Sequence, residues 1–204
     1  LIVGRLGAAQ LAATNIALNV SMLAFMPMIG MGITVSILVG QSLGANNDDM
    51  ADTATTSAVQ MAFIYMGSIS ALYLLIPSIF IYPFAANADP TEFEEIRGYA
   101  MTAMKFVAAW SLVDSLGIVY SSALKGAGDT RFTMYTIIVL SLILLILPTF
   151  IALELMGWGL EAAWAIGVVY IIGLAVAFNL RYRAGKWRTM RVIEQSAFEG
   201  PHQT

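Results

Sequence analysis

The stretch that decides the fold is Phe106–Leu124, which reads FVAAWSLVDSLGIVYSSAL and carries one charged residue, Asp114. The next charged residue is Lys125, which lies ~16 Å further along a helix axis at ~1.5 Å per residue. In an apolar helix, Asp114 is therefore near the middle of a hydrocarbon layer ~30 Å thick. A carboxylate at that depth costs about 2.5–3.5 kcal/mol on insertion scales, so it indicates an ion or proton site inside a membrane protein.

The composition of the whole chain also indicates a membrane protein. Its 204 residues are 59% hydrophobic and 11% charged, and the mean hydropathy is +0.78. A soluble domain has about 25% charged residues, so this chain has too few for a surface that faces water. There are no cysteines, and the one histidine is His202. These counts exclude disulfides, thiolate metal sites and histidine-based catalytic triads within the membrane. We expect no enzyme, and no cofactor apart from a coupling ion.

Five apolar segments predict an all-α fold, a polytopic bundle of transmembrane helices, because a span needs ~20 apolar residues. The predicted transmembrane region is 1–183, and 184–204 is the predicted cytoplasmic tail. The predicted spans are residues 11–42, 53–84, 97–124, 131–153 and 160–182.

The basic residues predict the orientation of these spans. Two regions hold seven of the ten Lys and Arg residues: the segment after the fifth span and the loop between the third and fourth spans. Both regions fall on the same side of the membrane, and positive-inside distribution places them in the cytoplasm. The C-terminus is therefore predicted to be cytoplasmic. The seven residues are Lys125, Arg131, Arg181, Arg183, Lys186, Arg188 and Arg191.

Several residues are predicted to lie at the membrane interfaces. Trp158, Trp164 and Trp187 are close to predicted span ends, where tryptophan is typical of an aromatic belt. Lys105 is nine residues before Asp114 and roughly on the opposite helix face, so it is expected to extend toward the outer interface.

The loop between the third and fourth spans, Leu124–Arg131, reads LKGAGDTR. Its two glycines permit a sharp turn, and Asp129 is predicted to cap the fourth helix by accepting from exposed amides. The Gly-x-Gly-Asp string also resembles that of intramembrane aspartyl proteases, which need two facing aspartates. Asp129 lies between two basic residues at the interface, and Val113 precedes Asp114 where those enzymes have Tyr. The sequence therefore argues against a protease.

Short motifs follow one another in a fixed order along the chain. They are LGAA at Leu6–Ala9 with LAA at Leu11–Ala13, Met26-Pro27, VGQSLGA at Val39–Ala45, and LKGAGDT at Leu124–Thr130. With its motifs in this order, the chain resembles the multidrug and toxic compound extrusion (MATE) family over nearly all of residues 4–190.

That resemblance implies a transporter with twelve helices in two lobes of six. The chain then corresponds to helices eight to twelve, and we expect helix seven and the N-terminal lobe to lie outside this sequence. The start at Leu1 instead of Met agrees with a fragment of the C-terminal lobe. The expected location is a bacterial plasma membrane. The expected partners are the lipid bilayer, the missing helices and small organic cations, with no nucleic acid.

The resemblance also implies a role for Asp114. Its position before the Gly-x-Gly-Asp loop matches the helix-ten aspartate of the NorM-like branch, which helps to bind the coupling cation. Its acidic partner in that branch lies on helix seven, outside this sequence. Apart from the resemblance, a lone carboxylate at depth lowers its cost by taking up a proton or by holding a cation. We expect Asp114 to bind the coupling ion, Na⁺ or H⁺.

Four further residues are candidates for the site or for a substrate cavity. Trp110, one turn before the aspartate, stacks on an aromatic cation or packs as an ordinary core residue. Ser111 ligates the cation or bonds its own helix backbone. Asn15 and Asn19 share a face of the first span, where they line a substrate cavity or make interhelical hydrogen bonds.

These observations lead to one expected function and two alternatives. We expect secondary active multidrug efflux by an antiporter that exports organic cations in exchange for Na⁺ or H⁺. The first alternative is a lipid or oligosaccharide flippase of related fold. A polyanionic cargo would require a cationic cavity, and the spans contain no Arg cluster. The second alternative is the intramembrane aspartyl protease.

Overall fold

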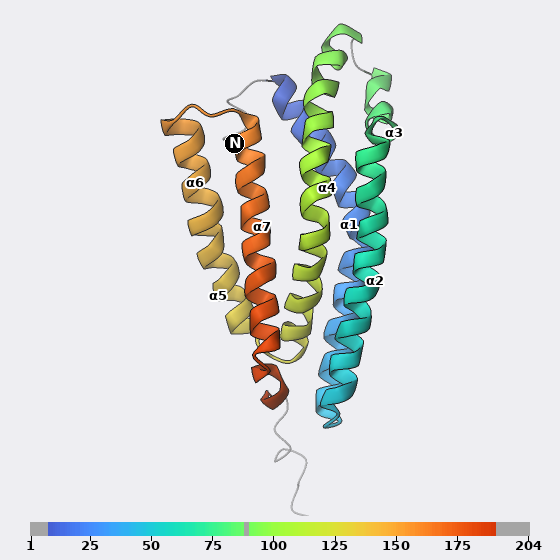
Figure 1. Cartoon of the computed structure of the whole chain (residues 1–204), viewed down its shortest axis with the longest axis vertical. Helices are drawn as coiled ribbons and strands as arrows, with labels where there is room; N and C mark the ends of the chain where they lie inside the picture. Colours follow the sequence, from blue (N-terminus) through green and yellow to red (C-terminus); the bar gives the residue numbers. More distant parts are fainter. Residues whose placement is uncertain (1–7, 88–89, 191–204) are drawn as a thin grey trace, which may run out of the picture.

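The computed structural model describes residues 8–87 and 90–190. Five helical segments in this part of the chain are long and apolar enough to cross a membrane, and Figure 1 shows them side by side along one direction. The expectation of an all-α bundle with five spans is confirmed. The segments are α1 (Ala8–Gly44), α2 (Asp48–Leu75), α4 (Pro90–Gly126), the run α5 (Thr130–Leu140), η3 (Ser141–Ile146), α6 (Leu147–Phe150) and η4 (Ile151–Leu155), and α7 (Leu160–Arg183).

The turn between α1 and α2 is built from residues that stop one helix and start the next. Asn46 has a positive φ of 54°, which asparagine tolerates better than most residues. The Asn47 side chain caps α2 by accepting from the Met50 amide at 3.0 Å. Asp48 and Asp49 in the first turn interact favourably with the positive end of the helix dipole.

A proline divides the second apolar segment. Ile76 has φ −137° and lies just before Pro77, where the helical conformation is disfavoured. Pro77 is the first residue of the short helix α3 (Pro77–Ile81), which continues as η2 (Tyr82–Asn87). The chain therefore turns at Ile76 before it crosses to α4.

The fourth span changes its hydrogen-bonding pattern around Pro148. The π-helical segments η3 and η4 lie on either side of α6, which contains this proline. Proline has no amide hydrogen to donate. The Leu147 amide donates to the Leu142 carbonyl, five residues back. Wider turns of this kind keep backbone groups satisfied where no water is present, so the span remains helical through the proline.

Helix α4 is the central element of the bundle. In its most apolar window 56% of the residues are buried, against 28% in α1 and in α2 and 6% in the fourth span. It contacts α1, α2 and α7, and Figure 1 shows it between α7 on one side and α1 and α2 on the other. Both clusters of buried hydrophobic residues include α4, through Met104 and Val107 in one and Val119 and Leu124 in the other.

Glycines bring α1 and α4 into backbone contact. A Cβ atom at Gly126 would overlap the backbone of Ser36, and one at Gly40 would lie 3.2 Å from the Gly126 carbonyl oxygen. At Gly32 a Cβ would lie 2.8 Å from Oγ of Ser122. Lipid tails remove the usual hydrophobic drive between helices, so close packing of small residues is what associates them.

An ion pair connects α7 to the loop between α4 and α5. The Nε of Arg181 donates to Oδ2 of Asp129 at 2.7 Å, and the guanidinium lies 4.6 Å from the ring centroid of Phe132. Asp129 occupies the N-cap position of α5 but makes no side-chain cap hydrogen bond. The prediction that its carboxylate caps this helix was therefore wrong, because the carboxylate pairs with Arg181.

A second set of contacts joins the end of α7 to α2. The Tyr182 hydroxyl donates to Asp52 at 2.8 Å, and Arg188 lies 3.3 Å from the other oxygen of that carboxylate. In η5 (Lys186–Thr189), Trp187 stacks on the Tyr182 ring at 4.9 Å and is 1% exposed. The prediction that Trp187 anchors the membrane surface was wrong, whereas Trp158 is 50% exposed.

Replacing Gly126 with alanine is expected to destabilise the protein by about 1–3 kcal/mol, because the added methyl group forces the α1 and α4 backbones apart. Gly98→Ala is the matched control. It lies in the same helix with nothing within 4 Å of an added Cβ, so it should raise stability slightly through helix propensity. Unfolding of detergent-solubilised protein by SDS titration measures both. Equal stability of the two variants would contradict the close-packing role of Gly126.

Asp129→Asn is expected to destabilise the protein by about 3 kcal/mol, because removing one member of a buried pair leaves the other charge uncompensated. The Asp129 and Arg181 side chains are 7% and 21% exposed, whereas those of Glu94 and Arg97 are 73% and 41% exposed. Glu94→Gln is therefore the control, with a cost of at most ~1 kcal/mol. The same SDS titration compares them, and similar costs would count against a structural role for the Asp129–Arg181 pair.

Candidate functional site

Asp114 lies in the second half of α4, 12 residues before the helix ends at Gly126, and is partly buried. Its neighbours along the helix define where it points. One turn earlier, Trp110 packs on Trp164 of α7 with ring centroids 5.1 Å apart. Three residues later, Gly117 also faces α7, where a Cβ would lie 3.5 Å from Cα of Ala175. The residues on one side of Asp114 therefore face α7.

The residues on its other side face α1. Ile118, one turn after Asp114, and Ser122, a further turn on, lie against Gly32 of α1. With 3.6 residues per turn, Asp114 falls between the direction of α7 and that of α1. We call this side of the central helix the α1–α7 flank of α4. It is the side opposite to the one that packs on α2, where Leu112 lies near Gly67.

Asp114 has no fixed partner in the part of the chain that the structure describes. Within residues 8–87 and 90–190 its carboxylate makes no hydrogen bond and no ion pair. Lys105 is exposed and lies on roughly the opposite face of α4. The carboxylate is therefore not fully exposed, and it is not paired with a basic residue in the described part of the chain. It keeps the capacity to take up a proton or a cation.

The hydroxyls beside Asp114 bond their own helix. Ser111 is fully buried and donates to the Val107 carbonyl at 2.6 Å. Ser115 donates to the Leu112 carbonyl, also at 2.6 Å. The backbone-bonding alternative for Ser111 is thus what the structure shows. Its oxygen still has lone pairs that can accept a cation, so a ligand role stays a prediction.

Trp110 is packed between helices. Its ring lies against Trp164, tilted by 34°, and beside Gly167 of α7. This contact corresponds to the core-packing alternative, and stacking on a bound cation remains a prediction. Trp164 is only 7% exposed. The prediction that it anchors the membrane interface was wrong, because its ring packs into the interior against Trp110.

Asn15 and Asn19 lie on an exposed flank of α1. The Asn19 side chain donates to the Asn15 carbonyl at 2.8 Å, so this amide bonds its own helix and not a neighbouring one. The helical repeat continues the same flank through Met26 to Ile29 and Ile33. Those isoleucines border a cavity between α1 and α4, and a cavity-lining role for the two asparagines stays a prediction.

Two cavities lie along the α1–α7 flank of α4, one on either side of Asp114. The upper cavity, in the orientation of Figure 1, has a volume of about 420 Å³ and lies among α1, α4 and α7. The lower cavity has about 390 Å³ and lies between α1 and α4. Polar or aromatic residues of the upper cavity are Gln10, Tyr99, Thr102, Glu161 and Trp164, and those of the lower cavity are Ser36, Ser121, Ser122 and Lys125.

Sequence reasoning found Asp114 but not these cavities. The upper one joins residues from three helices that are up to 154 positions apart, from Gln10 to Trp164. No short motif marks such a set. The one available signal was Glu161, an acidic residue directly at the start of an apolar span.

Comparison with known proteins places the chain in a family. The MatE family model matches residues 1–151. A probable multidrug resistance protein NorM of Brucella suis biovar 1 (strain 1330) is 29% identical over 131 residues, 64% of this chain and 28% of that protein. The multidrug resistance protein NorM of Burkholderia vietnamiensis is 32% identical over 134 residues, 66% of this chain and 29% of that protein.

A longer alignment includes α7. A probable multidrug resistance protein NorM of Caulobacter vibrioides is 28% identical over 201 residues, 97% of this chain and 41% of that protein. The chain thus spans less than half the length of these relatives. The family model nevertheless covers most of its 204 residues. By this match, and with five helices able to cross a membrane, the chain belongs to the MatE family of multi-pass membrane proteins.

Proposed function

We propose that the protein is a secondary active exporter of organic cations and that Asp114 binds the ion whose influx drives export. The observation that carries this proposal is a partly buried carboxylate on the most buried span that has no partner within residues 8–87 and 90–190. A charge in that position is costly, and proteins keep such charges chiefly at ion and proton pathways.

The coupling role follows from how the cost is relieved. A proton or a sodium ion that binds Asp114 neutralises the carboxylate, and release of that ion restores the negative charge. The stability of the packing around Asp114 therefore depends on whether the ion is bound. Two conformations that differ in access to Asp114 would then differ in ion affinity, which is what couples an ion gradient to movement of the helices. A permanent basic partner would prevent this exchange.

The relatives support the export of drugs. They are named as multidrug resistance proteins. Because the chain spans less than half of their length, transport belongs to a protein with further helices. We propose that this chain supplies helices eight to twelve of the C-terminal lobe and that a helix before it provides the acidic partner of Asp114. The segment after α7 is proposed to be cytoplasmic, in a bacterial plasma membrane.

The two alternatives receive less support from the structure. For a protease, Asp114 and Asp129 would have to meet, yet 12 residues of α4 from Asp114 to Gly126 separate them by ~18 Å along the axis. Asp129 is also paired with Arg181. For a flippase with an anionic cargo, the upper cavity offers the acidic Glu161 and no basic side chain among the described residues that line it.

Asp114→Asn is expected to abolish export, because the amide keeps the shape of the side chain but takes up no proton near neutral pH and has no negative charge to balance a sodium ion. Cells that produce the variant should retain a fluorescent organic cation as strongly as cells that lack the protein. Asp49→Asn makes the same change at an exposed position and should export normally. Immunoblots of membranes check that both are inserted. Full export by Asp114→Asn with normal insertion would refute the coupling role.

A second experiment identifies the coupling ion. In membrane vesicles, an imposed gradient of the coupling ion, either Na⁺ or H⁺, should drive movement of the fluorescent cation, and the other gradient should not. Asp114→Asn should remove the response, whereas Asp49→Asn should keep it. Equal driving by both gradients in the Asp114→Asn variant would show that coupling occurs elsewhere.

A further inference from the structure

We infer that the lower cavity holds an anionic phospholipid, with the phosphate at Lys125 and one acyl chain along α1. The site is separate from Asp114, because Lys125 is 11 residues further along the chain, or ~16 Å of helix. The inference does not require Asp114 to be the coupling residue, and it does not depend on which molecules the protein exports.

One wall of the lower cavity is a ridge of isoleucine. Ile29, Ile33 and Ile37 recur every four residues along α1, and all three are exposed. The ridge is ~12 Å long at ~1.5 Å per residue, and Ile118 adds an apolar side chain from α4. An apolar surface that is elongated and open on one side suits a hydrocarbon chain.

The polar residues of the lower cavity gather toward its lower end. They are Ser36, Ser121, Ser122 and Lys125. Those on α4 come after Ile118, and α4 runs downward to its end at Gly126 (Figure 1). On α1, Ser36 lies against Gly126. The cavity is therefore apolar above and polar below, which is the pattern of a lipid that enters with its headgroup at the membrane surface.

The polar groups at this end are donors in search of an acceptor. Within residues 8–87 and 90–190, Lys125 makes no ion pair, and the hydroxyls of Ser36 and Ser122 make no hydrogen bond. An ammonium group has three donors and no acceptor, and each hydroxyl has one donor. The phosphate and ester oxygens of a phospholipid only accept. No acidic side chain lines the cavity among the described residues, so a negative headgroup meets no repulsion there.

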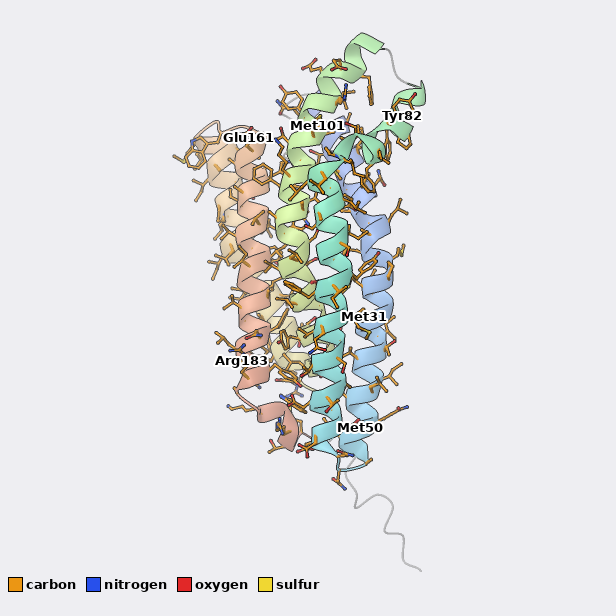
Figure 2. The ribbon with its side chains drawn as sticks, turned by 45° about the vertical axis from the view of Figure 1, so that its right-hand side comes forward. Met31, Met50, Tyr82, Met101, Glu161 and Arg183 are labelled. Carbon is orange, nitrogen blue, oxygen red and sulfur yellow. The ribbon has the colours of Figure 1, made fainter. Side chains whose placement is uncertain are left out.

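The surroundings of the lower cavity are also basic. Arg131, Arg183 and Lys186 are exposed at the same end of the bundle. Figure 2 shows Arg183 near the lower end of α7, and it shows Met31, from the isoleucine-bearing stretch of α1, in the lower half of the bundle. The two aspartates at the start of α2 do not line the cavity. Basic pockets between transmembrane helices bind anionic lipid headgroups.

The floor of the lower cavity is fixed before any lipid arrives. Gly32 lies against Ser122, and the backbone of Ser36 lies against Gly126, so α1 and α4 cannot close on each other or slide apart freely. A preformed site loses little freedom on binding, which favours affinity. Its volume is about 390 Å³, within the range of roughly 300–1,000 Å³ for small organic ligands. It therefore takes the phosphate and part of one chain, and the rest of the lipid stays in the bilayer.

Lipid titration followed by native mass spectrometry tests the inference. The protein that carries this chain is stripped of lipid in a neutral detergent. It is titrated with dioctanoylphosphatidylglycerol, or with dioctanoylphosphatidylcholine, which has the same chains but no net charge. The phosphatidylglycerol should bind more tightly.

Variants of Lys125 assign that preference to the cavity. Lys125→Gln should weaken phosphatidylglycerol binding about fivefold, as expected for the loss of one basic contact of ~1 kcal/mol. Phosphatidylcholine binding should stay nearly constant. Lys125→Arg keeps the charge and should keep the preference. The control Arg131→Gln removes an exposed base at the same end that does not line the cavity, and it should change neither affinity.

A photoreactive lipid locates the acyl chain. Phosphatidylglycerol with a diazirine in one chain should label residues 29–37 of α1, and Lys125→Gln should reduce that labelling. Ile64 of α2 is 70% exposed and lies outside the cavity, so its labelling reports on lipid that merely surrounds the protein. Labelling of Ile64 should not change with Lys125→Gln.

Four results would overturn the inference. The first is equal affinity for the two lipids. The second is equal weakening by Lys125→Gln and Arg131→Gln, which would indicate general attraction by surface charge. The third is displacement of the lipid by inorganic phosphate, because the site would then take a free anion. The fourth is the absence of label from residues 29–37, which would show that a further helix of the protein covers the cavity.

Discussion

The backbone contact between α1 and α4 fixes the geometry on which the candidate site depends. Gly126 touches Ser36, and Gly32 lies against Ser122, so α4 has one possible rotation relative to α1. A shift of one residue in this register would turn Asp114 by ~100°. The carboxylate would then point toward α2 or toward lipid. In a bilayer, where no hydrophobic drive exists between helices, only such close contacts hold the rotation in place.

The distribution of charged residues reflects the lack of polar groups in the interior of a bilayer. Two acidic groups at the lower end of the bundle have basic partners, Asp129 with Arg181 and Asp52 with Arg188. Asp114, which lies on the most buried span, makes no ion pair among the described residues. Attraction between opposite charges is strongest where the dielectric constant is low. A base on the facing side of α1 or α7 would therefore pair with Asp114, and no such contact occurs among the described residues.

How much of this could be read from the sequence depends on the distance over which each feature is encoded. Hydropathy alone predicted five spans, because a span is a property of one continuous segment. Asp114 was found for the same reason, as one charge in one apolar stretch. Gly126 was assigned to a turn, yet its packing depends on Ser36, 90 positions away. Asp129 was assigned to a cap, which is the local use of that side chain, but Arg181 lies 52 positions away. The upper cavity needs three helices at once, and no local pattern encodes that.

The two cavities on the α1–α7 flank of α4 differ in the sign of their charged residues. The upper one offers Glu161 and aromatic rings, and the lower one offers Lys125. Asp114 is 11 residues from Lys125, or ~16 Å of helix. Glu161 and Lys125 are in contact with solvent, and salt screens exposed charges beyond ~10 Å at 0.1 M ionic strength. The difference in charge therefore acts close to each cavity and not at Asp114 itself. Because Glu161 and Lys125 are both exposed, this asymmetry is set by side chains that the packing of the helices does not require.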